Sequence, residues 1–132
     1  NILMIAKRIW NLFRQSSDVV FYCFSDIDEL WTRSTAIAAS RMGLKCIVAT
    51  AGAGAAWPLQ HYKINGITVL TAVQPSDASS LGGEVIVTAT SAVNRDLFPT
   101  SASYLVHMPH SLTSLHAIYP EGAFSGYDVL FA

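Results

Sequence analysis

The chain has 132 residues, which is enough for one domain with a hydrophobic core of its own. Only 13% of the residues are charged and the net charge is −1, so the composition excludes a general attraction to nucleic acid. Because 52% of the residues are apolar, we expect many strands buried on both faces, or a surface that packs on something else. No apolar run reaches the roughly 18 to 20 residues that span a bilayer.

Residues 1–15 have the spacing of an amphipathic helix. Apolar residues recur every three or four positions with basic residues between them: Ile2, Ile5, Ile9, Leu12 and Phe13 are apolar, and Lys7, Arg8 and Arg14 are basic. Such a helix packs on the body of the fold or rests on an anionic membrane surface, and the sequence leaves both interpretations open.

The next stretch predicts a strand, a helix and a second strand. The runs 18–24 and 45–50 are dominated by apolar residues, as is typical of the central strands of a parallel sheet. Between them, Ser25 and Asp28 offer an N-cap with an acid three residues later, and Gly43 ends the helix. The apolar residues that indicate this helix are Leu30, Ala36, Ile37, Ala39 and Met42. We therefore expect a βαβ unit with a right-handed crossover.

Shorter strands and helical turns alternate through the rest of the chain. Strands are predicted at 67–71, 84–88, 104–108 and 127–131; helical turns are predicted at 58–62, near 94–97 and at 112–118; and residues 74–83 form a loop or a short helix. The sequence therefore predicts one α/β domain over residues 1–132. It is Rossmann-like in the broad sense, with flanking helices and a mostly parallel sheet of about six strands.

Two local patterns superficially indicate chemistry. Gly52-Ala-Gly54-Ala-Ala-Trp57 follows a strand like a dinucleotide fingerprint, but Trp57 replaces the third glycine and Pro58 follows it. We interpret this run as an edge loop and predict no cofactor. We interpret Asp26, Asp28 and Glu29 as acids that favour a helix start, with a metal or acid/base cluster as the alternative.

The two cysteines lie in separate predicted strands. We interpret Cys23 and Cys46 as buried free thiols, because the chain has no CxxC motif and no zinc-ligand spacing. A disulfide between neighbouring strands is the alternative.

Three of the four histidines fall between positions 107 and 116. In open α/β folds, ligands bind beyond the carboxyl ends of the strands, and histidine moves protons near neutral pH. His110 follows Pro109 at such an end, so we predict that it is exposed and functional. His107 lies inside the strand and is either a core histidine or a site residue, and His116 falls on the next helix. No metal site is predicted, because the three lack the close pair or fourth ligand of a zinc site.

The last part of the chain resembles the CDP-glycerol glycerophosphotransferase family, the teichoic-acid-type polymerases with a GT-B fold. The likeness is carried by the run Leu105-Val-His-Met-Pro-His110-Ser111, which stands where the family has an apolar strand and a Trp-His-Gly element. It is also carried by Gly-Ala-Phe124-x-x-Tyr127-Asp128 and by the upstream run Glu84-Val-Ile-Val-Thr-Ala-Thr90. The sequence departs from the family in Pro109 and Ser111, and in lacking the lysine that often follows.

The resemblance implies that the chain is the N-terminal, acceptor-side half of a two-domain GT-B protein that builds a cell-envelope polymer. It implies that His110 is the base that deprotonates the hydroxyl of a polyol-phosphate or glycan acceptor. The residues expected to bind substrate are His107, Ser111, Thr113 and His116. The donor, CDP-glycerol or another nucleotide-activated group, would bind a second domain beyond Ala132. The expected location is the cytoplasm, with contact at the inner face of the membrane left open.

Two other functions remain open. A non-catalytic α/β module would bind a small ligand or a partner protein, and half of a sugar-nucleotide epimerase would share the GT-B shape. A receiver or flavodoxin domain fits poorly, because no Asp ends the run 67–71 and Asp26-Ile-Asp-Glu would repel a phosphate.

Overall fold

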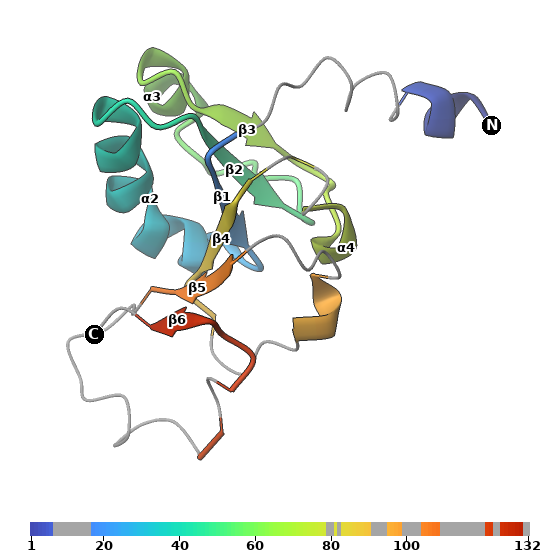
Figure 1. The fold of residues 1–132 in the computed structure, drawn as a ribbon. Coiled ribbons are helices and arrows are strands. Elements are labelled where there is room, and N and C mark those ends of the chain that lie inside the picture. Colours follow the sequence, from blue (N-terminus) through green and yellow to red (C-terminus); the bar gives the residue numbers. More distant parts are fainter. Residues whose placement is uncertain are drawn as a thin grey trace.

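A single parallel sheet organises the chain. The computed structural model describes residues 1–6, 17–78, 81, 83–90, 95–98, 104–108, 121–122 and 125–130. Within these ranges, six strands pair in parallel in the order β3-β2-β1-β4-β5-β6 (Figure 1). They are β1 (Val19–Cys23), β2 (Cys46–Thr50), β3 (Thr68–Leu70), β4 (Val85–Thr88), β5 (Tyr104–His107) and β6 (Val129–Leu130). The predicted Rossmann-like α/β fold with a parallel sheet is thereby confirmed.

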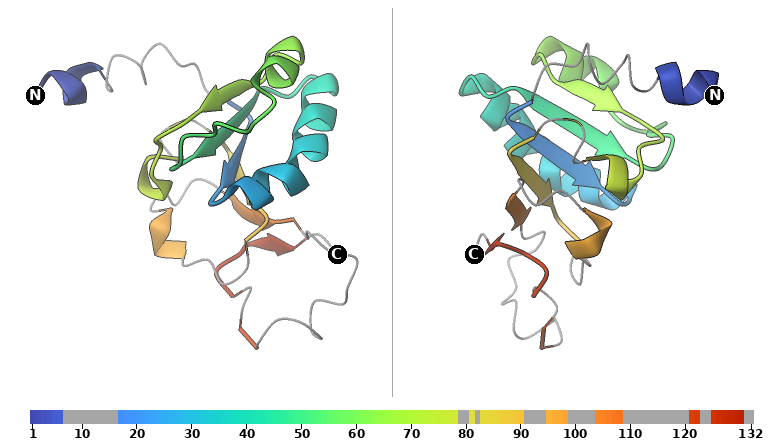
Figure 2. Two further views of the ribbon diagram at one scale, coloured as in Figure 1. Left: turned by 180° about the vertical axis from the view of Figure 1, so that it is seen from behind. Right: turned by 45° about the vertical axis from the view of Figure 1, so that its right-hand side comes forward.

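Helices lie on both faces of the sheet (Figure 2). On one face are α2 (Asp26–Arg41) and α3 (Leu59–Ile64), and on the other are α4 (Pro75–Ala78) and the 3-10 helix η2 (Arg95–Leu97). The chain moves outward from β1 through β2 to β3, and then returns to β4 on the other side of β1. Right-handed crossovers made in opposite directions place their helices on opposite faces, which explains this division.

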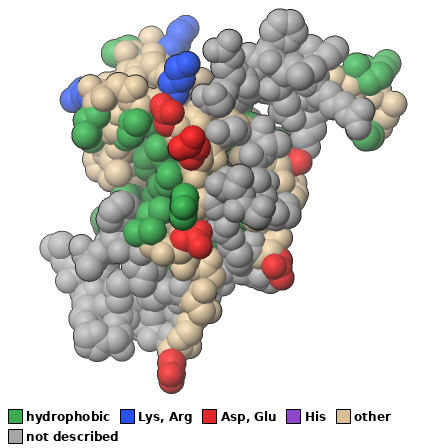
Figure 3. All heavy atoms as spheres, in the orientation of Figure 1, with side chains coloured by type: hydrophobic (Ala, Val, Ile, Leu, Met, Phe, Trp, Pro, Cys, Tyr) green, Lys and Arg blue, Asp and Glu red, His purple; other side chains and the backbone are tan. Residues whose placement is uncertain are grey.

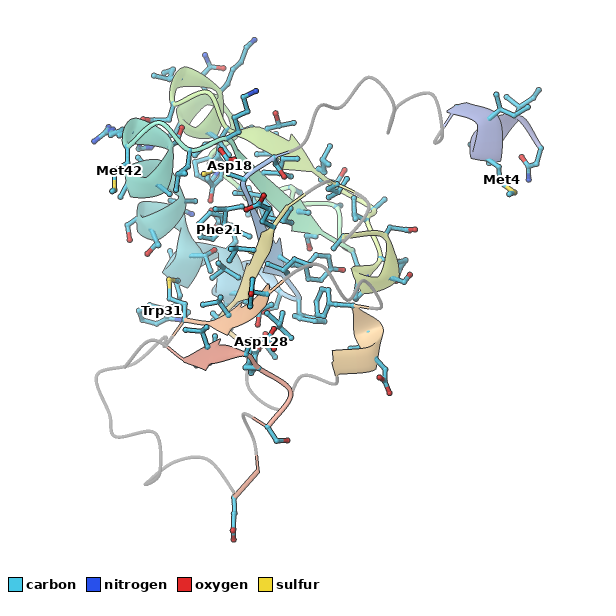
Figure 4. The ribbon with its side chains drawn as sticks, in the orientation of Figure 1. Met4, Asp18, Phe21, Trp31, Met42 and Asp128 are labelled. Carbon is cyan, nitrogen blue, oxygen red and sulfur yellow. The ribbon has the colours of Figure 1, made fainter. Side chains whose placement is uncertain are left out.

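The central strands are buried on both faces. Along β1, Phe21 and Cys23 belong to the cluster under α2 and α3, whereas Val20 and Tyr22 belong to the cluster on the opposite face. Figure 4 shows Phe21 in the layer between the sheet and α2. Because successive side chains of a strand point to opposite faces, a strand covered on both sides needs apolar residues at every position. This explains the uninterrupted apolar runs of the sequence.

Helix α2 begins and ends where the sequence predicts. Ser25 is the N-cap, and its Oγ accepts a hydrogen bond of 3.3 Å from the Asp28 N–H. The helix ends before Gly43, whose φ of +94° places it in the left-handed region that glycine adopts at little cost. Both signals are local, which is why they were visible in the sequence.

The faces of α2 differ from the apolar pattern that indicated the helix. Ala36 and Ile37 are buried, but Leu30 is 56% exposed and Met42 is 82% exposed. The side chains of Asp28, Glu29 and Thr32 point inward instead. The Thr32 hydroxyl donates to the Asp28 carbonyl of the same helix at 3.0 Å, and the hydrogen bonds of Asp28 and Glu29 are described below.

Some predicted elements fall outside the described residues. Of the helix expected over residues 1–15, the helical part at 2–6 is described, and 7–16 lie outside the described ranges. The helical segment predicted at 112–118 also lies outside them. In the part of the chain that the structure describes, no helix has both the length and the apolar character needed to cross a membrane.

Candidate site at the carboxyl edge of the sheet

The candidate site lies where β1 and β4 end side by side. The connections that follow these strands lead to opposite faces of the sheet, so this position is the topological switch point of the fold. In open α/β sheets, such a point is where ligands bind. The segments that meet here are 24–28 after β1, 88–90 at the end of β4, and 107–108 at the end of β5.

Asp28 joins the first two of these segments. Its side chain is 9% exposed, and Oδ2 accepts hydrogen bonds from the Phe24 N–H at 3.0 Å and from the Thr90 hydroxyl at 2.5 Å. Because Asp28 also donates its N–H to the N-cap Ser25, the start of α2 is fixed to the ends of both central strands. The carboxylate therefore has a defined position at the switch point.

Tyr127 continues this network toward β6. Its hydroxyl donates to the Thr90 carbonyl and is hydrogen bonded to the Thr88 hydroxyl. Burial raises the pKa of Tyr127 to about 12, and the negative charge of Asp28 acts in the same direction. The phenol therefore stays protonated and keeps its hydrogen to donate at neutral pH.

His107 is the one predicted site residue that the described ranges include. It ends β5 opposite Thr88, its side chain is completely buried, and its ring meets the ring of Tyr127 edge to face at 5.1 Å. This placement agrees with the interpretation of His107 as a core histidine, and its role in substrate binding stays a prediction. The other predicted site residues, His110, Ser111, Thr113 and His116, lie outside the described residues.

The remaining acids at the start of α2 join helices and loops to one another. The Asp26 Oδ1 accepts a bond of 2.7 Å from the Trp57 indole N–H. Glu29 is buried; it accepts a bond of 2.5 Å from the Tyr62 hydroxyl and two of 2.9 Å from the Arg33 guanidinium. Glu29 in turn raises the pKa of Arg33. These contacts support the structural interpretation of the acids. Within the described ranges, no group of three or more His, Cys, Asp or Glu is arranged to hold a metal ion.

The glycine loop after β2 packs against the end of β3. Gly54 has φ +61°, and a Cβ there would lie 3.2 Å from the Thr71 side chain, so glycine is required for the turn and for close packing. Trp57, in the place of the third fingerprint glycine, is buried. Gly54 thus has a conformational and packing reason, in agreement with the interpretation of this run as an edge loop.

The cysteines cannot form the disulfide that the sequence left open. Cys23 pairs in register with Thr50, and Cys46 with Val19, so the two cysteines lie at opposite ends of neighbouring strands. Four strand positions correspond to about 13 Å, beyond the reach of a disulfide. Both thiols are free and buried, which confirms the interpretation as free thiols.

A hollow of about 340 Å³ lies at the opposite, amino edge of the sheet. It is lined by Ser17, Leu44, Lys45, Cys46, Ile47, Gly66 and Thr68. Lys45 is the charged group of this lining, and burial raises the pKa of the Cys46 thiol to about 11, so the thiol is a poor nucleophile. We therefore take the carboxyl edge, not this hollow, as the candidate site, because the switch point and a network of polar hydrogen bonds both lie at the carboxyl edge.

The geometry defines the chain as a Rossmann-like parallel α/β domain. In comparisons with protein-family models, curated proteins and solved structures, nothing matches this chain.

Proposed function

We propose that this chain is the acceptor-side domain of a glycerophosphotransferase, or of a related glycosyltransferase, that builds a cell-envelope polymer. In this proposal the domain binds a polyol-phosphate or glycan acceptor at the carboxyl edge of its sheet. A second domain holds the nucleotide-activated donor, such as CDP-glycerol, across the cleft.

The observation that carries the proposal is the position of the end of β5. The Met108 N–H donates to the Thr88 carbonyl at 2.8 Å, so the chain is still beside β4 at this residue. His110 follows two residues later, and two residues of chain span at most about 7 Å. The proposal therefore expects His110 close to this end of the sheet, as the resemblance of this segment to the transferase family implies.

The proposed reaction needs one proton acceptor on this side of the cleft. The neutral imidazole of His110 takes the proton of the acceptor hydroxyl while its oxygen attacks the phosphorus of the donor, and the nucleotide leaves with the bonding electron pair. Ser111 and Thr113 supply hydroxyl groups for hydrogen bonds to a phosphate or an acceptor hydroxyl, and His116 orients the substrate. His107, packed on Tyr127, supports the end of β5 from within the core.

The described residues form a hydrogen-bonded support for such a site. Asp28, Thr90 and Tyr127 connect the ends of β1 and β4 to the segment before β6. A base must hold its geometry to within a fraction of an ångström to accept a proton efficiently, and a buried, hydrogen-bonded support provides this.

The proposal includes a cytoplasmic location, with contact at the inner face of the membrane as the part to be tested. The helical part at 2–6 supports this, because Ile2, Leu3, Met4 and Ile5 are each more than half exposed and offer an apolar surface. Basic residues follow it in the sequence, so binding of the chain to anionic vesicles tests this part of the proposal.

Replacement of His110 by alanine tests the proposed base. In the longer protein that includes the donor domain, we expect His110→Ala to lower turnover at least about 100-fold, with an unchanged circular dichroism spectrum, because a general base contributes this much or more. His61→Ala is the matched control, since His61 is an exposed histidine on α3. Turnover of His110→Ala close to that of the control would remove His110 from the reaction.

A further inference from the structure

The outward face of α2 is unusually apolar for an exposed helix. Its first half exposes three large apolar residues: Ile27 is 66% exposed, Leu30 56% and Trp31 46%. Figure 3 shows hydrophobic side chains gathered over this helix, and Figure 4 shows Trp31 and Met42 on the side that faces away from the sheet. The acids Asp28 and Glu29 of the same helix point inward. An apolar surface of this kind marks an interaction site.

These residues follow one line along the helix, which we call the α2 stripe. Its members are Ile27, Leu30, Trp31, Ser34, Ala38 and Met42, all of them exposed. The spacing of three and four positions keeps them on one side of a helix about 24 Å long. The stripe carries large side chains at its amino end and small ones at its centre, and no charged residue lies on it.

We infer that the α2 stripe binds a second copy of this chain, with the two α2 helices packed antiparallel about a two-fold axis near Ser34. This arrangement places the large Leu30 of one copy on the small Ala38 of the other, so that a bulky side chain meets a gap. It also brings the exposed Asp26 at one end of the stripe near the exposed Arg41 of the other copy. Within one copy the Asp26 Oδ1 accepts from Trp57 and the Arg41 Nε donates to Asn65 at 3.1 Å, so the contact between copies would add to these bonds. Opposite charges thus meet at both ends, and the helix dipoles run in opposite directions.

The stripe is self-complementary in size, shape and charge. A two-fold interface requires this property, whereas binding to a membrane surface does not. Asp26 at the apolar end would repel anionic lipids. A single pair of helices buries less than a standard interface of about 800 Å² per partner, so we expect a weak dimer whose population depends on protein concentration. The dimer does not depend on the proposed transferase activity.

Sedimentation velocity over about 1 to 300 μM tests the dimer. We expect the chain to shift from monomer to dimer with concentration, and Leu30→Lys to weaken the dimer at least about tenfold, because a charge would be buried at the contact. Leu59→Lys is the matched control, since Leu59 is an exposed leucine (51%) on α3, outside the stripe. A chain that stays monomeric at every concentration, or a dimer that both variants weaken equally, overturns the inference.

A cysteine at the two-fold axis tests the antiparallel geometry. At an axial separation of about 8–10 Å, Cα atoms facing each other on the contact line lie within about 6 Å, because each stands about 2.3 Å from its own axis. Ser34→Cys is therefore expected to form a disulfide between copies on mild oxidation, whereas Ser76→Cys, an exposed position on α4, is not.

Two outcomes contradict this geometry. One is a dimer in which Ser34→Cys forms no more disulfide than Ser76→Cys. The other is a dimer that Leu3→Lys abolishes and Leu30→Lys leaves intact, which would show that the N-terminal helix joins the copies instead of α2.

Discussion

Burial controls the ionisation of the side chains along β1 and β2. It raises the pKa of the Cys23 thiol to about 12, that of Cys46 to about 11 and that of Tyr22 to about 12. Each group is neutral when protonated, and its pKa in the folded state is above its pKa in the unfolded chain. The raised pKa values contribute to the free energy of unfolding. For the thiols this contribution is fully present below the pKa of about 8.5 in the unfolded chain, and it is lost as the pH rises through the pKa values of the folded state.

The thiols provide a direct measurement of this effect. At pH 8 we expect neither Cys23 nor Cys46 of the folded protein to react rapidly with a thiol reagent, because both are buried and protonated. In denaturant we expect both thiols to react rapidly. The number of rapidly reacting thiols is therefore two in the unfolded chain and zero in the folded protein. Rapid labelling of either cysteine in the folded state would contradict the described burial.

The network at the switch point illustrates what a sequence reveals at the scale of residues. The capping role of Ser25 and Asp28 was predictable, because both residues lie within one turn of the helix start. The bond from Asp28 to Thr90, 62 residues later, had no signal, because it depends on β1 and β4 being neighbours in the sheet. The bonds of Tyr127 to Thr88 and Thr90 depend on the fold in the same way.

At the scale of elements, α2 shows why its faces could not be assigned from apolar spacing alone. The predicted pattern included Leu30 and Met42, which the structure exposes, and passed over Glu29, which it buries. A buried carboxylate is tolerated only when its partners satisfy it, and those partners are Tyr62 on α3 and Arg33. Arg33 lies four residues from Glu29 on the same helix, but Tyr62 lies 33 residues from Glu29, so the sequence near α2 gives no signal for the contact with Tyr62.

Loss of the Tyr62 hydroxyl tests the contact between α2 and α3. We expect Tyr62→Phe to lower the free energy of unfolding by about 1–2 kcal/mol, because Glu29 keeps Arg33 but loses a short hydrogen bond in the core. Tyr104→Phe is the matched control, since Tyr104 is 61% exposed, and it should change the stability by less than about 0.5 kcal/mol. Urea unfolding of the two variants measures the difference; equal stabilities would mean that this contact contributes nothing.

At the scale of the whole molecule, the class of fold was predictable and the order of its strands was not. Continuous apolar runs such as 45–50 indicate strands buried on both faces, which in turn indicates a parallel sheet with helices on each side. The position of β4 beside β1 has no local signal, because nothing in the run 84–88 specifies its neighbour. That neighbour decides where the switch point falls, and therefore where the candidate site lies.

Two-dimensional NMR of the isotope-labelled chain tests the proposed acceptor site most directly. On titration with a short poly(glycerol phosphate), we expect the amide signals of Phe24, Thr90 and Met108, at the carboxyl edge, to shift with a single dissociation constant. Shifts confined to Lys45 and Gly66, which line the hollow at the amino edge, or no shifts at all, would contradict it.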